Sequence, residues 1–226
     1  MALTSEEIIA ELRSLANPDN VQGMSRYGIN PHNTLGVSMP VVRELGKRVG
    51  KNHILAEELW SSGIHEARIL AGLVDDPKQV TDEQMERWVL DFDSWDVCDQ
   101  VCSNLFDRTP FAYKKALEWS EREEEFVKRA GFVLMAELST HDKKAPDEKL
   151  LPFFDIILRE ANDDRNFVKK AVNWALRGLG KRSKFLNQHA VHTAEKMAQI
   201  DSKAARWNAS DTLRELNSEK VQARLK

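Results

Sequence analysis

The chain has 226 residues, of which 42% are apolar and 31% charged, a composition typical of a globular protein with a core of its own. The net charge of −3 argues against attraction of the whole protein to nucleic acid, so such binding needs local segregation of charge. The acidic start, MALTSEEIIAELRSLA, and the lack of an apolar run of about 18 residues argue against a secretion signal and a membrane-spanning helix.

The apolar residues recur with the period of an α-helix along the chain, and no segment alternates with a period of two. A capping box at Thr4 opens a first helix that stops at Asn17, a second helix spans about 19–27, and a long loop covers 28–40. We expect the other helices at about 39–49, 53–62, 64–74, 82–92, 95–106, 110–121, 123–139, 147–161, 166–181, 184–199 and 203–217.

Residues with short polar side chains precede several of these helices. Such side chains accept hydrogen bonds from the first N–H groups of a helix, and proline is favoured in its first turn. We therefore expect N-caps at Ser38, Thr81, Ser94, Thr109 and Asp147.

A weak internal repeat relates two of the helices. VKRAGFVLMAEL (127–138) aligns with VKKAVNWALRGL (168–179) at a spacing of 41 residues, and EARILAGL (66–73) has a similar pattern. A period of about 40 with two helices per unit is typical of HEAT-like solenoids, in which one helix of each pair lines a concave surface. The sequence therefore predicts one all-α domain, residues 1–226, a helical-repeat superhelix with these three helices on its concave side.

The segment Phe167–Lys184 combines an ordinary core face with an unusual outer face. Its core positions have helical spacing, whereas its largest apolar side chain, Trp174, projects outward among the cations Lys170, Arg177 and Lys181. From Arg165 to Ala194 there are seven Lys/Arg and no Asp or Glu. Cations with an outward indole suit nucleic acid, because they can bind phosphates while the ring stacks on bases. Alternatively, Trp174 packs on a neighbouring helix and the cations are merely solvated.

The helix in DSWDVCDQVCSNLF (93–106) carries a second candidate site. Trp95 and Asp99 lie one turn apart at the edge of a core stripe that includes Cys98 and Cys102. Asp99 is either a site residue or a solvated helix acid. The cysteines are poorly placed to bridge, so we expect reduced thiols and a cytoplasmic protein, nucleoid-associated if bacterial.

Arg129 lies closer to the apolar face of its helix than a solvated arginine needs to. It could form a salt bridge with Glu137 or Asp99, or present its planar guanidinium to a phosphate. His189 and His192 could chelate a metal, but no third ligand accompanies them at a recognised spacing, so we predict no metal site.

Several segments together resemble the AlkD-like DNA alkylation repair glycosylases over nearly the whole chain. The resemblance rests on MSRYG (24–28), LGVSMPVVREL (35–45), SWDVCD (94–99), FVKRAGFVLMAEL (126–138) and VKKAVNWALRGLGK (168–181). It implies an all-α superhelix of HEAT-like repeats with a concave basic groove for duplex DNA. It also implies excision of cationic N3- and N7-alkylpurines without base flipping, by a cofactor-free enzyme acting as a monomer.

The resemblance also assigns roles to residues. Asp99 matches the catalytic aspartate, and Trp95 and Trp174 match the two indoles that flank the lesion. Arg129 and Arg177 match DNA-backbone arginines, and Tyr27 matches an aromatic residue near the lesion. Family members often carry an aromatic pair where this chain has Ser94-Trp95, a difference that could alter how the lesion fits.

Two hypotheses follow for the function. The first is a monofunctional DNA glycosylase for alkylated duplex DNA, and the second is a non-catalytic HEAT-repeat module that binds DNA or protein. Asp99 distinguishes the two hypotheses and favours the glycosylase, because a non-catalytic scaffold has no use for a carboxylate that repels phosphate inside a basic groove.

Overall fold

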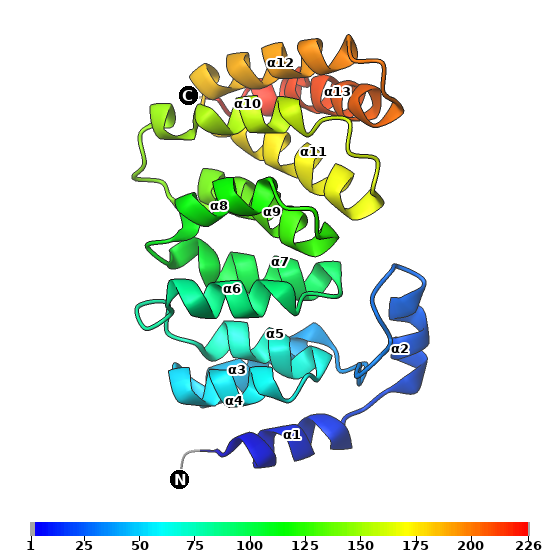
Figure 1. The fold of residues 1–226 in the computed structure, drawn as a ribbon, viewed down its shortest axis with the longest axis vertical. Helices are drawn as coiled ribbons and strands as arrows, with labels where there is room; N and C mark the ends of the chain where they lie inside the picture. The colour runs from blue at the N-terminus through cyan, green and yellow to red at the C-terminus, as the bar shows by residue number, and fades with distance from the viewer. Residues whose placement is uncertain (1–2, 226) are drawn as a thin grey trace. The chain divides into compact units, whose positions relative to one another are not determined.

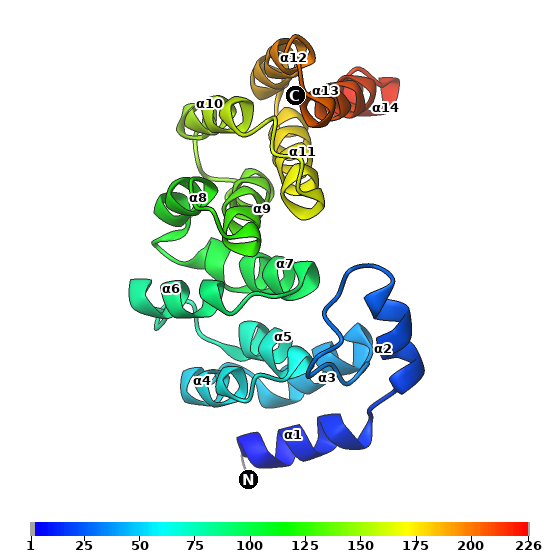
Figure 2. The same ribbon diagram turned by 45° about the vertical axis from the view of Figure 1, so that its right-hand side comes forward.

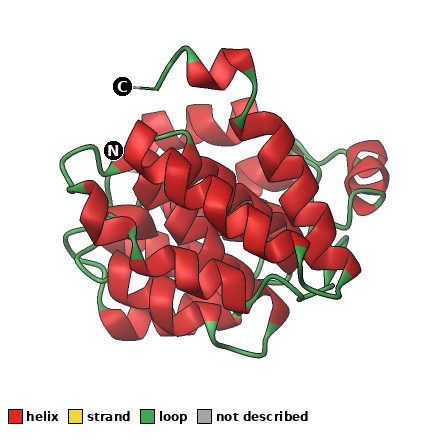
Figure 3. Ribbon diagram, turned by 90° about the horizontal axis from the view of Figure 1, so that it is seen from above, coloured by secondary structure: helices red, strands yellow, loops and turns green. Residues whose placement is uncertain are grey.

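The structure, a computed structural model, describes residues 3–225, and these contain helices, turns and loops but no strand (Figure 3). Contacts group the chain into two compact units, one up to Pro110 and one from Phe111 onward. The single domain expected from the sequence therefore stays a prediction. Within the described range, no helix is both long and apolar enough to cross a membrane.

The described part of the first unit, residues 3–110, contains seven α-helices and a short 3-10 helix (Figure 1): α1 Ser5–Ser14, α2 Pro18–Ser25, α3 Met39–Val49, α4 His53–Ser61, α5 His65–Val74, α6 Asp82–Leu90, α7 Trp95–Asn104 and η1 Phe106–Arg108. Helix α5 packs against α3, α4 and α7 and buries most of its residues. Trp60 and Trp88 stack at 4.0 Å between ring centroids, and Phe106 lies beside Trp88, so α4 and α6 share an aromatic cluster.

The second unit contains α8 Ala112–Ser120, α9 Glu125–His141, η2 Asp147–Leu150, α10 Pro152–Arg159, α11 Asn166–Gly180, α12 Lys184–Ala198, α13 Lys203–Leu216 and α14 Glu219–Gln222. Helices α8, α10 and α12 form one row and α9, α11 and α13 a second (Figure 2). Gly131 lets α8 and α9 approach closely, because a Cβ there would lie 2.5 Å from the backbone nitrogen of Ser120. Two of the three repeat-related segments thus lie in the second row.

Most expected helices are present, but two cap predictions were wrong. Helix α8 begins at Ala112, and the hydroxyl of Thr109 instead donates to the carbonyl of Phe106 at 2.8 Å. Helix α10 begins at Pro152, and Asp147 instead binds Arg182 and Ser183. The capping box at Thr4 and the cap at Thr81 are confirmed. Ser38 and Ser94 occupy cap positions without a capping hydrogen bond from their side chains.

Candidate nucleic-acid interface

A buried carboxylate in the first unit holds the loop between α2 and α3. Glu66, 1% exposed, accepts the N–H groups of Leu35, Gly36 and Val37 at 2.9, 2.6 and 3.1 Å. Gly36 has a φ of 77°, which favours glycine, and a Cβ there would collide with the carbonyl oxygen of Asn17. Three charge-assisted hydrogen bonds to one carboxylate therefore fix the backbone of this loop.

The same loop is also attached to the start of α7. The buried Ser94 hydroxyl accepts the N–H of Asn30 at 2.9 Å, and the Asn30 amide donates to Asp93 at 2.7 Å. The indole N–H of Trp95 donates to the carbonyl of Tyr27 at 3.1 Å. An aromatic side chain in place of Ser94 would displace Asn30, so the serine suits this particular loop.

Trp95 and Tyr27 line an open cleft of about 650 Å³ in the first unit. Its other walls are mainly apolar, including Met24, Ile29 and Met39. Tyr27 is 75% exposed, whereas Trp95 is half-buried. The structure thus brings together two of the residues that the resemblance places near a lesion.

An acid on the cleft wall has a buried histidine as its partner. Asp96 lies 2.9 Å from the Nε2 atom of His65. Burial lowers the pKa of His65, but the hydrogen bond and charge of Asp96 outweigh burial, so the pKa is raised above its usual value. This ion pair orients Asp96 at the first turn of α7.

Asp99 lies one turn after Trp95 at the edge of the core stripe of α7, and it is half-buried. The stripe itself is confirmed, since Cys98, Val101 and Cys102 are fully buried. Both thiols are free, and burial, reinforced by Cys98, raises the pKa of Cys102 well above its usual value. These cysteines are inert core residues, whereas Asp99, like Asp96, is a half-buried acid outside the core stripe of α7.

In the second unit, α11 has the two faces expected from its sequence. All six predicted core positions are fully buried: Val168, Ala171, Val172, Ala175, Leu176 and Leu179. Trp174 is 36% exposed and therefore does not belong to that core. It lines an open pocket of about 780 Å³ together with Ser139, Thr140, Lys143, Ala145, Pro146, Asp147, Gly178, Lys181 and Arg182.

The cations on the outer face of α11 are not all alike. Arg177 donates to Asp211 at 3.0 Å and pairs with Glu215, and Lys181 donates to Glu215 at 3.0 Å. Helix α13 therefore supplies the acids that the 165–194 segment lacks. Lys170 is exposed, and among residues 3–225 no ion pair engages it. The alternative in which these cations are merely solvated is therefore wrong for Arg177 and Lys181.

Arg129 is buried, with 6% of the residue exposed. Its Nη1 donates to the carbonyl of Phe167 at 2.6 Å, which ties α9 to the first turn of α11. The burial agrees with the expectation that Arg129 lies closer to the apolar face of its helix than a solvated arginine would. Its assignment as a DNA-backbone contact stays a prediction.

Arg182 has a structural role that its place in the basic run did not reveal. Its guanidinium donates to the carbonyls of Ser139, Asp142 and Ala145 and to the carboxylate of Asp147, all within 3.0 Å. Arg182 therefore holds the loop after α9, which lines the pocket beside Trp174. The repeat offered no signal for it, because Arg182 lies beyond the aligned segments.

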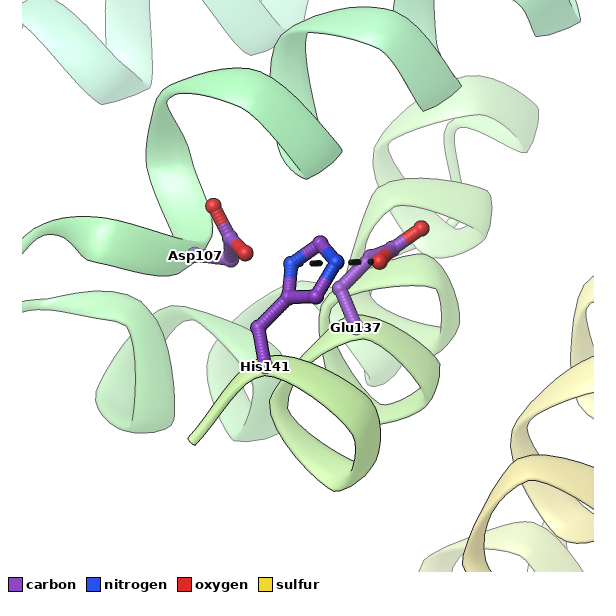
Figure 4. Close-up of side chains that lie close together, drawn as sticks. All are labelled: Asp107, Glu137 and His141. Carbon is purple, nitrogen blue, oxygen red and sulfur yellow. Dashed lines mark ion pairs between the residues drawn. The ribbon is translucent and has the colours of Figure 1, made fainter. Parts of the chain in front are cut away.

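His189 contacts two aromatic rings, and His141 lies near an acid of its own helix. His189 stacks on Phe154 at 5.7 Å between centroids and meets Phe185 edge-on at 4.8 Å. His141, the last residue of α9, lies 3.4 Å from Glu137 one turn earlier (Figure 4). Asp142, the residue that follows α9, accepts the Tyr113 hydroxyl at 3.0 Å.

Charge is distributed unevenly between the two units. The first unit has 10 Lys/Arg and 18 Asp/Glu, and is therefore acidic. The second unit has 23 Lys/Arg and 18 Asp/Glu, and is therefore basic. The segregation of charge that binding to a polyanion needs is therefore found in the second unit, where α11 lies.

A sequence model of the family described as "DNA alkylation repair enzyme" matches residues 8–209. The chain belongs to that family. Two proteins of similar sequence have names that assign no activity. Uncharacterized protein Lin0241 of Listeria innocua is 23% identical over 206 residues, covering 88% of each chain. Uncharacterized protein Lmo0209 of Listeria monocytogenes is 24% identical over 153 residues, covering 66% of this chain and 67% of its own.

One solved structure also resembles this member of the DNA alkylation repair family. It is described as "a new family of proteins related to the HEAT-like repeat DNA glycosylases with affinity for branched DNA structures". Its TM-score is 0.82 at 21% identity, covering 99% of this chain and 96% of the other. The all-α HEAT-like repeat fold predicted from the sequence is therefore confirmed. The roles of Asp99, Trp95, Trp174 and the basic residues stay predictions, as does the groove that they would share.

Proposed function

We propose that the protein is a monofunctional DNA glycosylase that hydrolyses the N-glycosidic bond of cationic N3- and N7-alkylpurines in duplex DNA, without base flipping. An alkylated purine of this kind already carries a positive charge, so it leaves as a neutral base without a general acid. The difficulty is the positive charge that grows on the deoxyribose. A fixed carboxylate stabilises that charge and can orient or deprotonate the attacking water.

The observation that carries the proposal is the arrangement at the start of α7. Trp95 is anchored through its N–H to the carbonyl of Tyr27, and the half-buried Asp99 follows one turn later. Asp99 would stabilise the sugar cation, and Trp95 and Trp174 would favour a cationic nucleotide through their negative ring faces. Neither a metal ion nor an organic cofactor is needed for this chemistry.

The direct test is release of the modified base. Purified protein incubated with duplex DNA containing 7-methylguanine or 3-methyladenine should release free base and leave an abasic site. Undamaged duplex of the same sequence is the control. If no base is released under single-turnover conditions with excess protein, the glycosylase proposal is wrong.

A second candidate is a member of the family that binds DNA without excision. The acidic balance of the first unit, 10 Lys/Arg against 18 Asp/Glu, favours it, because DNA contacts would then come mainly from the second unit. The described affinity of the structurally similar protein for branched DNA also supports it. Binding of undamaged and branched DNA without base release would favour this candidate.

Affinity for duplex DNA should depend strongly on salt and weakly on sequence. Two to four phosphate contacts predict a fall of roughly ten- to a hundredfold between about 50 and 200 mM salt, since each contact releases counterions. Lys170→Gln should reduce the slope of log affinity against log salt by about one. Lys47→Gln, an exposed change on α3, is the matched control and should leave the slope unchanged. A constant affinity over this range would contradict DNA binding through these cations.

Trp174→Ala should slow excision without unfolding the protein. The residue is 36% exposed, so removing the ring should cost some stability, but less than removing a core tryptophan does. Loss of a cation–π contact of about 0.5–2 kcal/mol should slow excision by about two- to thirtyfold. Trp119→Ala is the contrasting variant, because Trp119 is fully buried and should lose about 3–5 kcal/mol of stability. A similar loss of stability for Trp174→Ala would place that ring in the core and remove its proposed role.

A further inference from the structure

A second exposed indole in the second unit is unexplained by the proposed lesion site. Trp207 on α13 is 43% exposed. The buried positions of the helix are Ala204, Ala205, Asn208, Ala209, Thr212 and Leu216. The largest apolar side chain of α13 therefore projects away from its core face, as Trp174 does on α11.

Trp207 has a cation as its neighbour. The Nζ atom of Lys169, from the first turn of α11, lies 5.2 Å from the centroid of the indole ring. Lys203, one turn before Trp207 on α13, and Arg206 are exposed, as is Lys170 beside Lys169. The ring thus has Lys169 beside it and further exposed cations nearby in the two helices, all of which can bind phosphate groups.

The pairing between α11 and α13 leaves positive charge at this end of the two helices. Farther along, Asp211 and Glu215 of α13 pair with Arg177 and Lys181 of α11. Trp207 lies one turn before Asp211 on the same face of α13 as these two acids. Arg206 pairs with the fully exposed Asp201 at 3.0 Å, a pair of little strength in water, whereas Lys169, Lys170 and Lys203 have no ion pair among residues 3–225.

We infer that Trp207, with Lys169, Lys170 and Lys203, is a stacking platform for an unpaired base of a single-stranded nucleic-acid segment. A duplex presents its charged backbone and hides its base faces, whereas a single strand offers both a base face and its phosphates. The exposed indole with neighbouring cations matches that pair of features. The inference rests on the proposed DNA binding and adds to it a segment outside the duplex.

The test compares two DNA ligands of identical duplex sequence, one blunt and one with a single-stranded oligothymidine tail, at fixed salt. Wild-type protein should bind the tailed ligand more tightly, by roughly fivefold to a hundredfold, the range for stacking one base. Trp207→Ala should bring the ratio of the two affinities close to one, and Trp207→Phe should keep most of it. Phe185→Ala removes an exposed ring on α12 and is the matched control, with an unchanged ratio. Thermal melting of each variant checks that it is folded.

The lysines supply an independent variant set. Lys169→Gln combined with Lys203→Gln should reduce the log–log slope of affinity against salt for the tailed ligand by about 1.4, the value for two phosphate contacts to a single strand. Equal wild-type affinity for both ligands, or a ratio unaffected by Trp207→Ala, would overturn the platform.

Wild-type base release, measured in parallel on the blunt duplex, separates this inference from the proposed catalysis. Release without preference for the tail removes the platform and leaves the glycosylase. A Trp207-dependent preference without release removes the glycosylase and leaves the platform. If neither ligand binds, both proposals are wrong.

Discussion

Asp99→Asn should reduce single-turnover release of 7-methylguanine by a factor of about ten to a thousand or more. The substitution keeps the size and one acceptor oxygen of the side chain but removes the charge that opposes the growing sugar cation, an electrostatic contribution worth several kcal/mol. Affinity for DNA should stay equal or rise modestly, because the change deletes a negative charge near phosphates. Both quantities are measured on the same protein preparation.

The control for Asp99→Asn is Glu83→Gln, which removes the same charge from an exposed position on α6 of the same unit. Neither base release nor affinity should change by more than about twofold, because a single exposed charge is largely screened. A structural role for Asp99 predicts instead that stability, affinity and release decline together. Undiminished release by a folded Asp99→Asn protein would refute the assignment of Asp99 as catalytic.

Glu66→Gln should lower the free energy of unfolding by about 3 kcal/mol. The carboxylate accepts three backbone N–H groups, and hydrogen bonds to a charged group contribute about 1.5–3 kcal/mol each. Glutamine keeps one acceptor oxygen, but its amide NH2 group would then face the backbone N–H donors of the loop in a buried site. For a chain of this length the melting temperature should fall by about 6–12 °C.

Glu58→Gln, an exposed change on α4 in the same unit, should alter stability by no more than about 0.5 kcal/mol. Hydrogen exchange gives a local readout, since the amides of Leu35, Gly36 and Val37 should exchange faster in Glu66→Gln. Unchanged melting and unchanged exchange at these three amides would show that the carboxylate does not hold the loop.

Local pattern was enough to predict which faces of the helices are buried. The six apolar positions of α11 and the stripe of α7 are in the core, and Trp174 is outside it. The reason is that the 3.6-residue period gathers apolar side chains on one face, and burying that face is favourable whichever helix packs against it. The same reasoning placed most helix boundaries within a few residues.

Polar partners were not predictable in this way. Thr109 and Asp147 resembled caps, but their side chains form other hydrogen bonds in the folded chain. Glu66 gave no signal at all, since its three partners come from a loop about 30 residues earlier in the sequence. The hydrogen-bond partner of a polar side chain depends on which groups lie next to it in the folded chain, and the local sequence does not contain that information.

The sequence by itself determined that this chain is a series of amphipathic helices in HEAT-like repeats, with an indole projecting from a basic helix and a carboxylate beside a second indole. Only the tertiary structure decided which of the charged side chains are paired with acids and which are buried. Helix α13 neutralises Arg177 and Lys181, and the contact of α9 with α11 buries Arg129. The physical reason is the distance along the chain over which each property is set. Apolar periodicity is a property of each helix by itself, whereas Arg177 and Asp211, 34 residues apart in sequence, can form an ion pair only after their two helices have packed side by side.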